Sequence, residues 1–272
     1  MSKIKTHLES LNNKGEKALT IFLTAGYPNI NSFTELAVKV IEAGADILEI
    51  GLPFADSLAD GPVIQSSYTE ALKQNVNLKL TLKLISEIRE KTNIPIVLMS
   101  ASNPILNYGI SKFRDDAIEL GVNGVIIPDI PLEEYDNFFQ NSFDGLDTII
   151  LTTPTSSEER IKSIDKRSSG FLYCVSVVGT TGIRNKFDDY VLENLERTYK
   201  LVENNKMQIG FGISSGEDVN RFSPFCDGVI VGSAVAVGVD VGVGVVSPTT
   251  RETGIVNALS SGSLLVIVRL AE

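Results

Sequence analysis

The sequence has no tryptophan, a single histidine, two cysteines and no cluster of basic residues. A net charge of −10 without any Lys/Arg cluster argues against a nucleic-acid partner. The one histidine, His7, lies in a polar N-terminal stretch, which argues against catalysis by histidine. Cys174 and Cys226 lie in apolar contexts without metal-ligand spacing, so they are predicted to be reduced core residues, and no metal site is expected.

Long hydrophobic runs are also missing. No run is long enough to span a membrane, and the N-terminus is too polar for a signal peptide, so we expect a cytoplasmic protein without a membrane partner. What the chain does have is 272 residues with a hydrophobic content of 43%. That is enough to bury a full core in one large α/β domain or in two small ones.

One pattern repeats along the chain: an apolar strand, a turn and an amphipathic helix. The strands are expected at residues 19–25, 46–50, 94–99, 123–128, 147–152, 171–177, 207–212 and 227–232. Most are continuous apolar runs, which is typical of strands buried on both faces. Eight such strands without a linker-like break predict a single (β/α)₈ TIM barrel over residues 1–234. A doubly wound open sheet is the alternative, but no GxGxxG follows the first strand.

The segment 235–272 departs from this pattern. Valine and glycine alternate from residue 235 to 245, which is a poor composition for a helix and has a period of two. We therefore expect an atypical Gly/Val-rich C-terminal tail in place of the amphipathic helix that should close the barrel. Such a tail is expected to pack poorly and to lower stability.

Two acids stand out near the second strand, in the stretch LEIGLPFADSLADGPVIQ at residues 48–65. Glu49 lies inside an apolar run at the strand's end, and Asp60 lies in the loop that follows. In a barrel both would project into the C-terminal mouth, where different surroundings can make one a proton donor and the other a base. Two structural alternatives stay open: Glu49 bonded to nearby backbone, and Asp60 capping a helix that begins near Pro62.

Glycine-rich segments follow the last three strands, at residues 177–185, 210–215 and 230–234. Small residues let backbone N–H groups approach an anion, and the loops after strands seven and eight usually hold phosphate in a barrel. One such loop is usually just a turn. Three of them together predict a phosphate ester as ligand.

The stretch at 48–65 resembles the signature of the tryptophan synthase alpha subunit family, approximately ELGxPFSDPxADGPxIQ. NPILNYG, GVIIPDIPLEE, VGTTGIRN and GFGISS match the same family in order, so the resemblance covers roughly residues 15–235. It implies a barrel that acts as a carbon–carbon lyase in the last steps of tryptophan biosynthesis. The implied reaction is retro-aldol cleavage of indole-3-glycerol phosphate to indole and glyceraldehyde 3-phosphate.

The resemblance also implies roles and partners. Glu49 would protonate indole C3 and take the glycerol hydroxyl proton, and Asp60 would interact with the indole N–H. This subunit would carry no cofactor, whereas pyridoxal phosphate is expected in a beta subunit that receives the indole within an alpha2–beta2 tetramer. The alternative is a weakly active or inactive barrel that binds and activates the beta subunit. A lyase that releases indole alone would have the same site.

Further site residues follow from the resemblance alone. The wall around the indole would be formed by Phe22, Leu98, Ile127, Leu151, Tyr173 and Phe211. Without the family these six would be assigned to the barrel core. A loop with Thr181 and Gly182 would close over the substrate, the threonine ordering Asp60, and would be disordered without ligand. The phosphate would lie at Gly212, Gly232 and Ser233.

The surface that meets the beta subunit would include residues 53–56 and Asp129. Ala55 and Ser57 stand where the family has serine and proline, so this loop is expected to be less rigid.

Overall fold

Nine parallel strand segments form one sheet with the order β5-β4-β3-β2-β1-β9-β8-β7-β6 in the computed structural model. The structure describes residues 2–57, 60–139, 142–176, 189–210, 213, 216–233 and 235–236. The strands are β1 (Ala18–Thr24), β2 (Ile47–Gly51), β3 (Ile96–Met99), β4 (Gly124–Ile126), β5 (Asp147–Ile149), β6 (Leu151–Thr152), β7 (Leu172–Val175), β8 (Met207–Gly210) and β9 (Gly228–Val231).

The sheet closes because β5 and β6 are two halves of one strand. β5 pairs with β4 and β6 pairs with β7, and only Ile150 separates the halves. The strand expected at 147–152 is therefore divided at Ile150. The N–H of Ile150 donates to the Ser168 hydroxyl at 3.1 Å. Counted as one, the two halves make an eight-stranded parallel barrel, which confirms the predicted fold and rules out the open doubly wound sheet.

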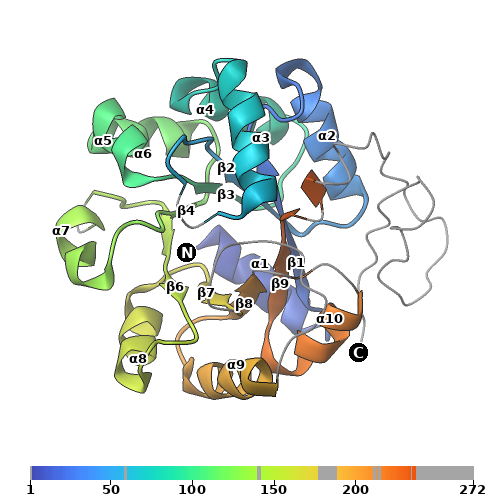
Figure 1. The fold of residues 1–272 in the computed structure, drawn as a ribbon, viewed down its shortest axis with the longest axis vertical. Helices are drawn as coiled ribbons and strands as arrows, with labels where there is room; N and C mark the ends of the chain where they lie inside the picture. The colour runs from blue at the N-terminus through green and yellow to red at the C-terminus, as the bar shows by residue number, and fades with distance from the viewer. Residues whose placement is uncertain are drawn as a thin grey trace.

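Helices surround this barrel (Figure 1). They are α1 (Lys3–Asn12), α2 (Ile30–Glu42), α3 (Pro62–Lys73), α4 (Leu78–Arg89), α5 (Ser102–Tyr108), α6 (Ile110–Glu119), α7 (Tyr135–Phe139), α8 (Glu158–Arg167), α9 (Asp189–Leu201) and α10 (Gly216–Phe222), with 3₁₀ turns η1 (Leu132–Glu134) and η2 (Ser223–Phe225). Within the described part of the chain, no helix is long and apolar enough to cross a membrane.

The covering helices form as their sequence predicts. Phe33, Ala37 and Val40 of α2 are buried on one face against the sheet. The chain leaves α2 through Gly44 and α6 through Gly121, both at positive φ, +115° and +98°. Glycine tolerates this left-handed region without the strain that a Cβ would add, so it suits the ends of both helices.

The core has two layers. An outer cluster packs between the sheet and the helices, and an inner cluster fills the barrel. We define the inner cluster by its buried members Ile4, Leu8, Leu11, Ala18, Phe22, Ile47, Ile64, Tyr68, Val97, Met99, Ile126, Ile149, Phe171, Tyr173, Val175 and Ile230.

Helix α1 closes the N-terminal end of the barrel. Its Ile4, Leu8 and Leu11 belong to the inner cluster, and a Cβ at Gly124, where β4 begins, would lie 2.8 Å from the Ile4 Cδ1 atom. Figure 1 shows α1 within the ring of strands. With that end filled, a ligand can enter only from the C-terminal ends of the strands.

Candidate active site

Glu49 points into the barrel. In the strand register it lies between Phe22 of β1 and Val97 of β3, both members of the inner cluster. Its side chain is 1% exposed, and its Oε2 atom has no hydrogen-bond partner among the described residues. Burial, and then the charge of Asp60, raise the pKa of Glu49 to about 8. The orphaned oxygen argues against a structural role in which this carboxyl is bonded to backbone.

Asp60 lies just before α3 and is half-buried. Gly61 occupies the N-cap position of α3, without a side-chain cap, and Pro62 is the first helical residue. Asp60 therefore does not cap the helix, and its carboxyl remains available to a ligand. Burial raises its pKa to about 6.

Asp60 lines a cavity of about 370 Å³ at the C-terminal mouth, together with Leu52, Phe54, Asp56, Ser57, Tyr68, Met99, Ser100, Ala101, Pro128 and Asp129. The cavity is bounded by the ends of β2 and β3, by the loops that follow β2, β3 and β4, and by α3. Its three carboxylates, at Asp56, Asp60 and Asp129, face no lysine or arginine among these lining residues. Such a cavity suits a neutral apolar group that carries a hydrogen-bond donor.

Helix α3 holds the Asp60 loop in place. The Gln65 carboxamide nitrogen donates to the carbonyl oxygens of Asp60 at 2.8 Å and of Ser57 at 3.2 Å. The helix itself is tied to β1, since the buried hydroxyls of Thr24 and Ser67 lie 2.6 Å apart. The position of Asp60 relative to Glu49 therefore depends on contacts that α3 makes.

Two aromatic rings lie over glycines near the acids. A Cβ at Gly51 would lie 2.4 Å from the Phe22 Cζ atom, and one at Gly210 would lie 2.2 Å from the Tyr173 hydroxyl. Both rings thus need the absence of a side chain at the ends of β2 and β8. Burial, and then the charges of Glu49 and Asp60, raise the pKa of Tyr173 well above its usual value.

The predicted indole wall is brought together only in part. Phe22 and Tyr173 belong to the inner cluster and Leu151 packs against it, whereas Leu98 and Ile127 belong to the outer cluster. Alternate residues of a strand face opposite sides, so a shift of one position reverses the face. Leu98 and Ile127 therefore pack away from the barrel interior, whereas their neighbours Met99 and Ile126 pack inside it. Phe211 lies outside the described residues.

Of the predicted phosphate site, the structure describes Gly232 and Ser233. A Cβ at Gly232 would lie 3.3 Å from the Cβ of Phe22, so this end of β9 adjoins β1. The Gly232 carbonyl oxygen accepts from the N–H groups of Val235 and Ala236, at 2.9 and 3.1 Å. Thr181, Gly182 and Gly212 lie outside the described residues, as do the expected closing loop at 178–188 and the tail beyond residue 236.

Asp129 joins two loops at the rim of the cavity. Its carboxylate accepts from the Ser102 backbone N–H at 3.0 Å and from the Ser102 hydroxyl at 2.7 Å, at the first residue of α5. The loops after β3 and β4 thus meet at this rim. Residues 53–56, which were predicted to share a surface with Asp129, include Phe54 and Asp56 of the same cavity.

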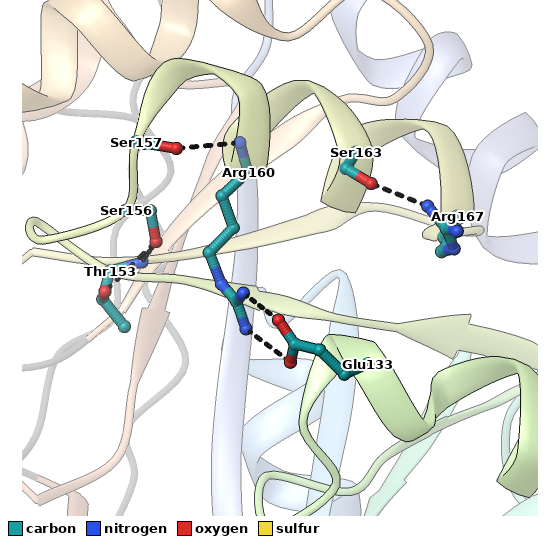
Figure 2. Close-up of polar contacts among 7 residues, drawn as sticks. All are labelled: Glu133, Thr153, Ser156, Ser157, Arg160, Ser163 and Arg167. Carbon is teal, nitrogen blue, oxygen red and sulfur yellow. Dashed lines mark hydrogen bonds and ion pairs between the residues drawn. The ribbon is translucent and has the colours of Figure 1, made fainter.

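Next to this rim, the first turn of α8 is tied to η1, which follows Asp129 in the loop after β4 (Figure 2). The Arg160 guanidinium pairs with both carboxylate oxygens of Glu133, and the Thr153 N–H donates to the Ser156 hydroxyl at 3.1 Å. The pair lowers the pKa of Glu133 to about 2. This side encloses a second cavity of about 450 Å³, between the loops after β4 and β6, which Ile127 and Leu151 also line.

Sequence reasoning missed four of these residues: Gln65, Tyr68, Met99 and Ile126. Gln65 is the last residue of the signature stretch at 48–65, so its closeness to Asp60 in the sequence could have marked it as a site residue. Met99 and Ile126 could not be separated from their apolar neighbours by pattern alone. No cluster of His, Cys, Asp or Glu in the described part of the chain could hold a metal ion.

Comparisons with known proteins agree with this geometry. The family model described as tryptophan synthase alpha chain matches residues 8–250, which runs past residue 235 into the Gly/Val-rich segment. The tryptophan synthase alpha chain of Petrotoga mobilis is 44% identical over 82% of this chain and 86% of its own length. The tryptophan synthase alpha chain of Prochlorococcus marinus is 44% identical over 86% of this chain and 84% of its own length.

Solved structures are similar too. Tryptophan synthase of Mycobacterium tuberculosis superposes with a TM-score of 0.81 at 31% identity, covering 88% of this chain and 91% of its own. Tryptophan synthase subunit alpha of Legionella pneumophila gives a TM-score of 0.79 at 33% identity, covering 88% and 89%.

Proposed function

The chain belongs to the tryptophan synthase alpha chain family and has that family's role in tryptophan biosynthesis, and from this premise we propose that its barrel cleaves indole-3-glycerol phosphate. The products would be indole and glyceraldehyde 3-phosphate. One observation supports this reaction above all. Near pH 7, Glu49 with a pKa of about 8 is mostly protonated, whereas Asp60 with a pKa of about 6 is mostly ionised. The site therefore holds both a proton donor and a carboxylate whose charge acts on it.

The reaction needs these two states. Glu49 donates its proton to indole C3, which places a positive charge on the ring. The Asp60 carboxylate accepts a hydrogen bond from the indole N–H and stabilises that charge. The bond from C3 to the glycerol carbon then breaks, and its electron pair restores the aromatic ring. The glycerol hydroxyl loses its proton to Glu49 as it becomes the aldehyde, so Glu49 regains the proton that it gave.

The remaining groups of the site bind the substrate. We assign the indole wall to the inner-face side chains Phe22, Met99, Ile126, Leu151 and Tyr173, with Phe211. Thr181 and Gly182 would close over the bound substrate, and the threonine hydroxyl would order Asp60. The phosphate would lie at Gly212, Gly232 and Ser233, next to the end of β9.

Membership of the family also implies a complex with a beta subunit. We propose that the complex is an alpha2–beta2 tetramer in the cytoplasm and that pyridoxal phosphate is bound by the beta subunit. The cavity rim with Phe54, Asp56 and Asp129 would face that partner, so the joined loops after β3 and β4 would move together when it binds.

The direct test is an assay of indole release by the purified chain, with and without a beta subunit. We expect indole from indole-3-glycerol phosphate in both cases and a faster rate with the partner. If the chain stimulates the beta subunit but releases no indole, the alternative holds: the barrel is an inactive partner. If it does neither, both functions are excluded.

Gln65→Ala is expected to slow indole release about ten-fold. The change removes two hydrogen bonds to backbone carbonyls, worth about 1–1.5 kcal/mol for positioning Asp60, and leaves both acids in place. The measurement is kcat at pH 7 with the melting temperature alongside. Gln74→Ala is a matched control, because its carboxamide holds the carbonyls of Pro28 and Glu70 at the other end of α3. Equal losses in both variants would contradict a specific role for Gln65.

A further inference from the structure

The second cavity, of about 450 Å³, adjoins the cavity that Asp60 lines. Pro128, an exposed residue just after β4, lines both cavities. From Pro128 the second cavity continues along Leu151 of β6 and Val175 of β7 at the mouth of the barrel. The two cavities are therefore neighbours that share Pro128 as a wall.

The second cavity also passes between two strands. Within the described residues, the pairing of β4 with β5 ends at Ile126 and Ile149, whereas β6 goes on to pair with β7. The cavity is lined by Ile149 and Val175 of the inner cluster and by Ile164 of the outer cluster. Because its walls come from both clusters, it extends from the barrel interior into the space under α8.

This opening lies across the barrel from the acid pair. With β5 and β6 counted as one strand, four steps around the sheet in either direction lead from β2 to β7, so β7 stands opposite β2. In the proposed reaction, indole C3 meets Glu49 of β2, and the indole N–H meets Asp60 in the loop after β2. The far edge of the ring, C5 and C6, therefore points toward β6 and β7, where Leu151 and Val175 line the second cavity.

The lining of the second cavity favours an uncharged apolar group. Most of its lining residues are aliphatic or aromatic. Among those that the structure describes, Arg160 is the only charged one, and its guanidinium is paired with both carboxylate oxygens of Glu133. The volume of the cavity lies in the range of small-molecule sites, so an alkyl group on the indole occupies only part of it.

We propose that the site accepts indole-3-glycerol phosphates with an apolar substituent at C5 or C6 of the indole, and that the second cavity holds the substituent. The two acids act on the pyrrole edge of the ring, so a group on the far edge leaves C3 and the N–H in place. Burial of the added carbons in an apolar cavity favours binding. The range of substrates cleaved rests on the proposed function, whereas the binding of substituted indoles can be measured without cleavage.

The first test is the binding of indole, 5-ethylindole and 6-ethylindole to the purified chain. The chain has no tryptophan, so the fluorescence of the indoles can be followed without a tryptophan signal from the protein. We expect at least one ethylindole to bind more tightly than indole, by about three- to ten-fold, because one to two carbons are buried. If neither binds more tightly than indole, the proposal is overturned.

Thr155→Phe tests whether the ethyl group lies in the second cavity. Thr155 is exposed, lines this cavity and belongs neither to the acid pair nor to the indole wall. The variant should bind indole as the parent chain does and lose most of the advantage of the ethyl group. Thr6→Phe, the same exchange on α1 at the N-terminal end of the barrel, is the matched control and should keep that advantage.

Thr153→Phe, at another exposed lining position, repeats the test if Thr155→Phe folds poorly. An ethyl advantage that survives unchanged in a folded variant with a filled cavity would overturn the proposal.

Cleavage of the ethyl-substituted substrates extends the test to the reaction. We expect the parent chain to cleave the better of the two with a kcat/KM within about ten-fold of the unsubstituted substrate, and Thr155→Phe to be about ten-fold slower again on it. Cleavage of the unsubstituted substrate alone would overturn the proposed substrate range. If the chain cleaves none of the three, the proposed function fails, and the binding of the ethylindoles still decides whether the second cavity holds the substituent.

Discussion

Glu49→Gln is expected to abolish indole release while the barrel stays folded. Glutamine has the same shape but no proton to give to indole C3, and loss of a general acid alone typically costs 10²–10⁴-fold. Because Glu49 also takes the hydroxyl proton in the proposed cycle, the loss should lie at or beyond the upper end. Indole release by Glu49→Gln near the parent rate would rule out the proposed mechanism.

The same substitution should stabilise the fold. A carboxyl whose pKa rises from 4.5 when unfolded to about 8 when folded binds more protons in the folded state between these pH values. The free energy of unfolding therefore falls as pH rises through this window, and the cost reaches about 3 kcal/mol at pH 7. Glutamine does not titrate, so Glu49→Gln removes this cost.

Chemical denaturation at pH 5 and at pH 8 measures the effect. The gain in unfolding free energy should be small at pH 5 and largest at pH 8. Glu119→Gln, an exposed glutamate of α6, serves as the control and should change neither stability nor rate. A stability difference that does not depend on pH would contradict the raised pKa of Glu49.

Asp60→Asn is expected to slow indole release by about 30- to 1,000-fold, or about 2–4 kcal/mol of barrier. The asparagine oxygen still accepts from the indole N–H but carries no charge to stabilise the ring cation. The loss should therefore be smaller than for Glu49→Gln. It should appear mainly in kcat, because the charge develops only as the transition state forms.

The pH profile distinguishes this role from a structural one. In the parent chain, activity should fall on the acid side near the Asp60 pKa of about 6, because protonation removes the carboxylate. Asp60→Asn should lose that acid limb. Asp144→Asn, on an exposed turn, is the control and should leave the profile unchanged. An acid limb near pH 6 that persists in Asp60→Asn would assign it to another group.

The sequence by itself determined the barrel and the acid pair. Continuous apolar runs alternating with amphipathic helices require strands buried on both faces. In the described structure these strands form a closed barrel of eight, with β5 and β6 counted as one. Glu49 and Asp60 could be found because a carboxylate inside an apolar run is a local signal, and the stretch at 48–65 carries a specific motif. Both signals lie within a few residues and need no knowledge of distant contacts.

Only the tertiary structure decided which side chains share the mouth. Strands buried on both faces do not alternate between polar and apolar residues, so the pattern could not separate Met99 from Leu98 or Ile126 from Ile127. The pairing of β2 with β3 and of β3 with β4 sets that phase. The sequence could not place Tyr68 for a related reason, because its position at the cavity depends on how α3 packs against the barrel. The pKa of Glu49 likewise follows from burial by several strands at once, which no local stretch of sequence contains.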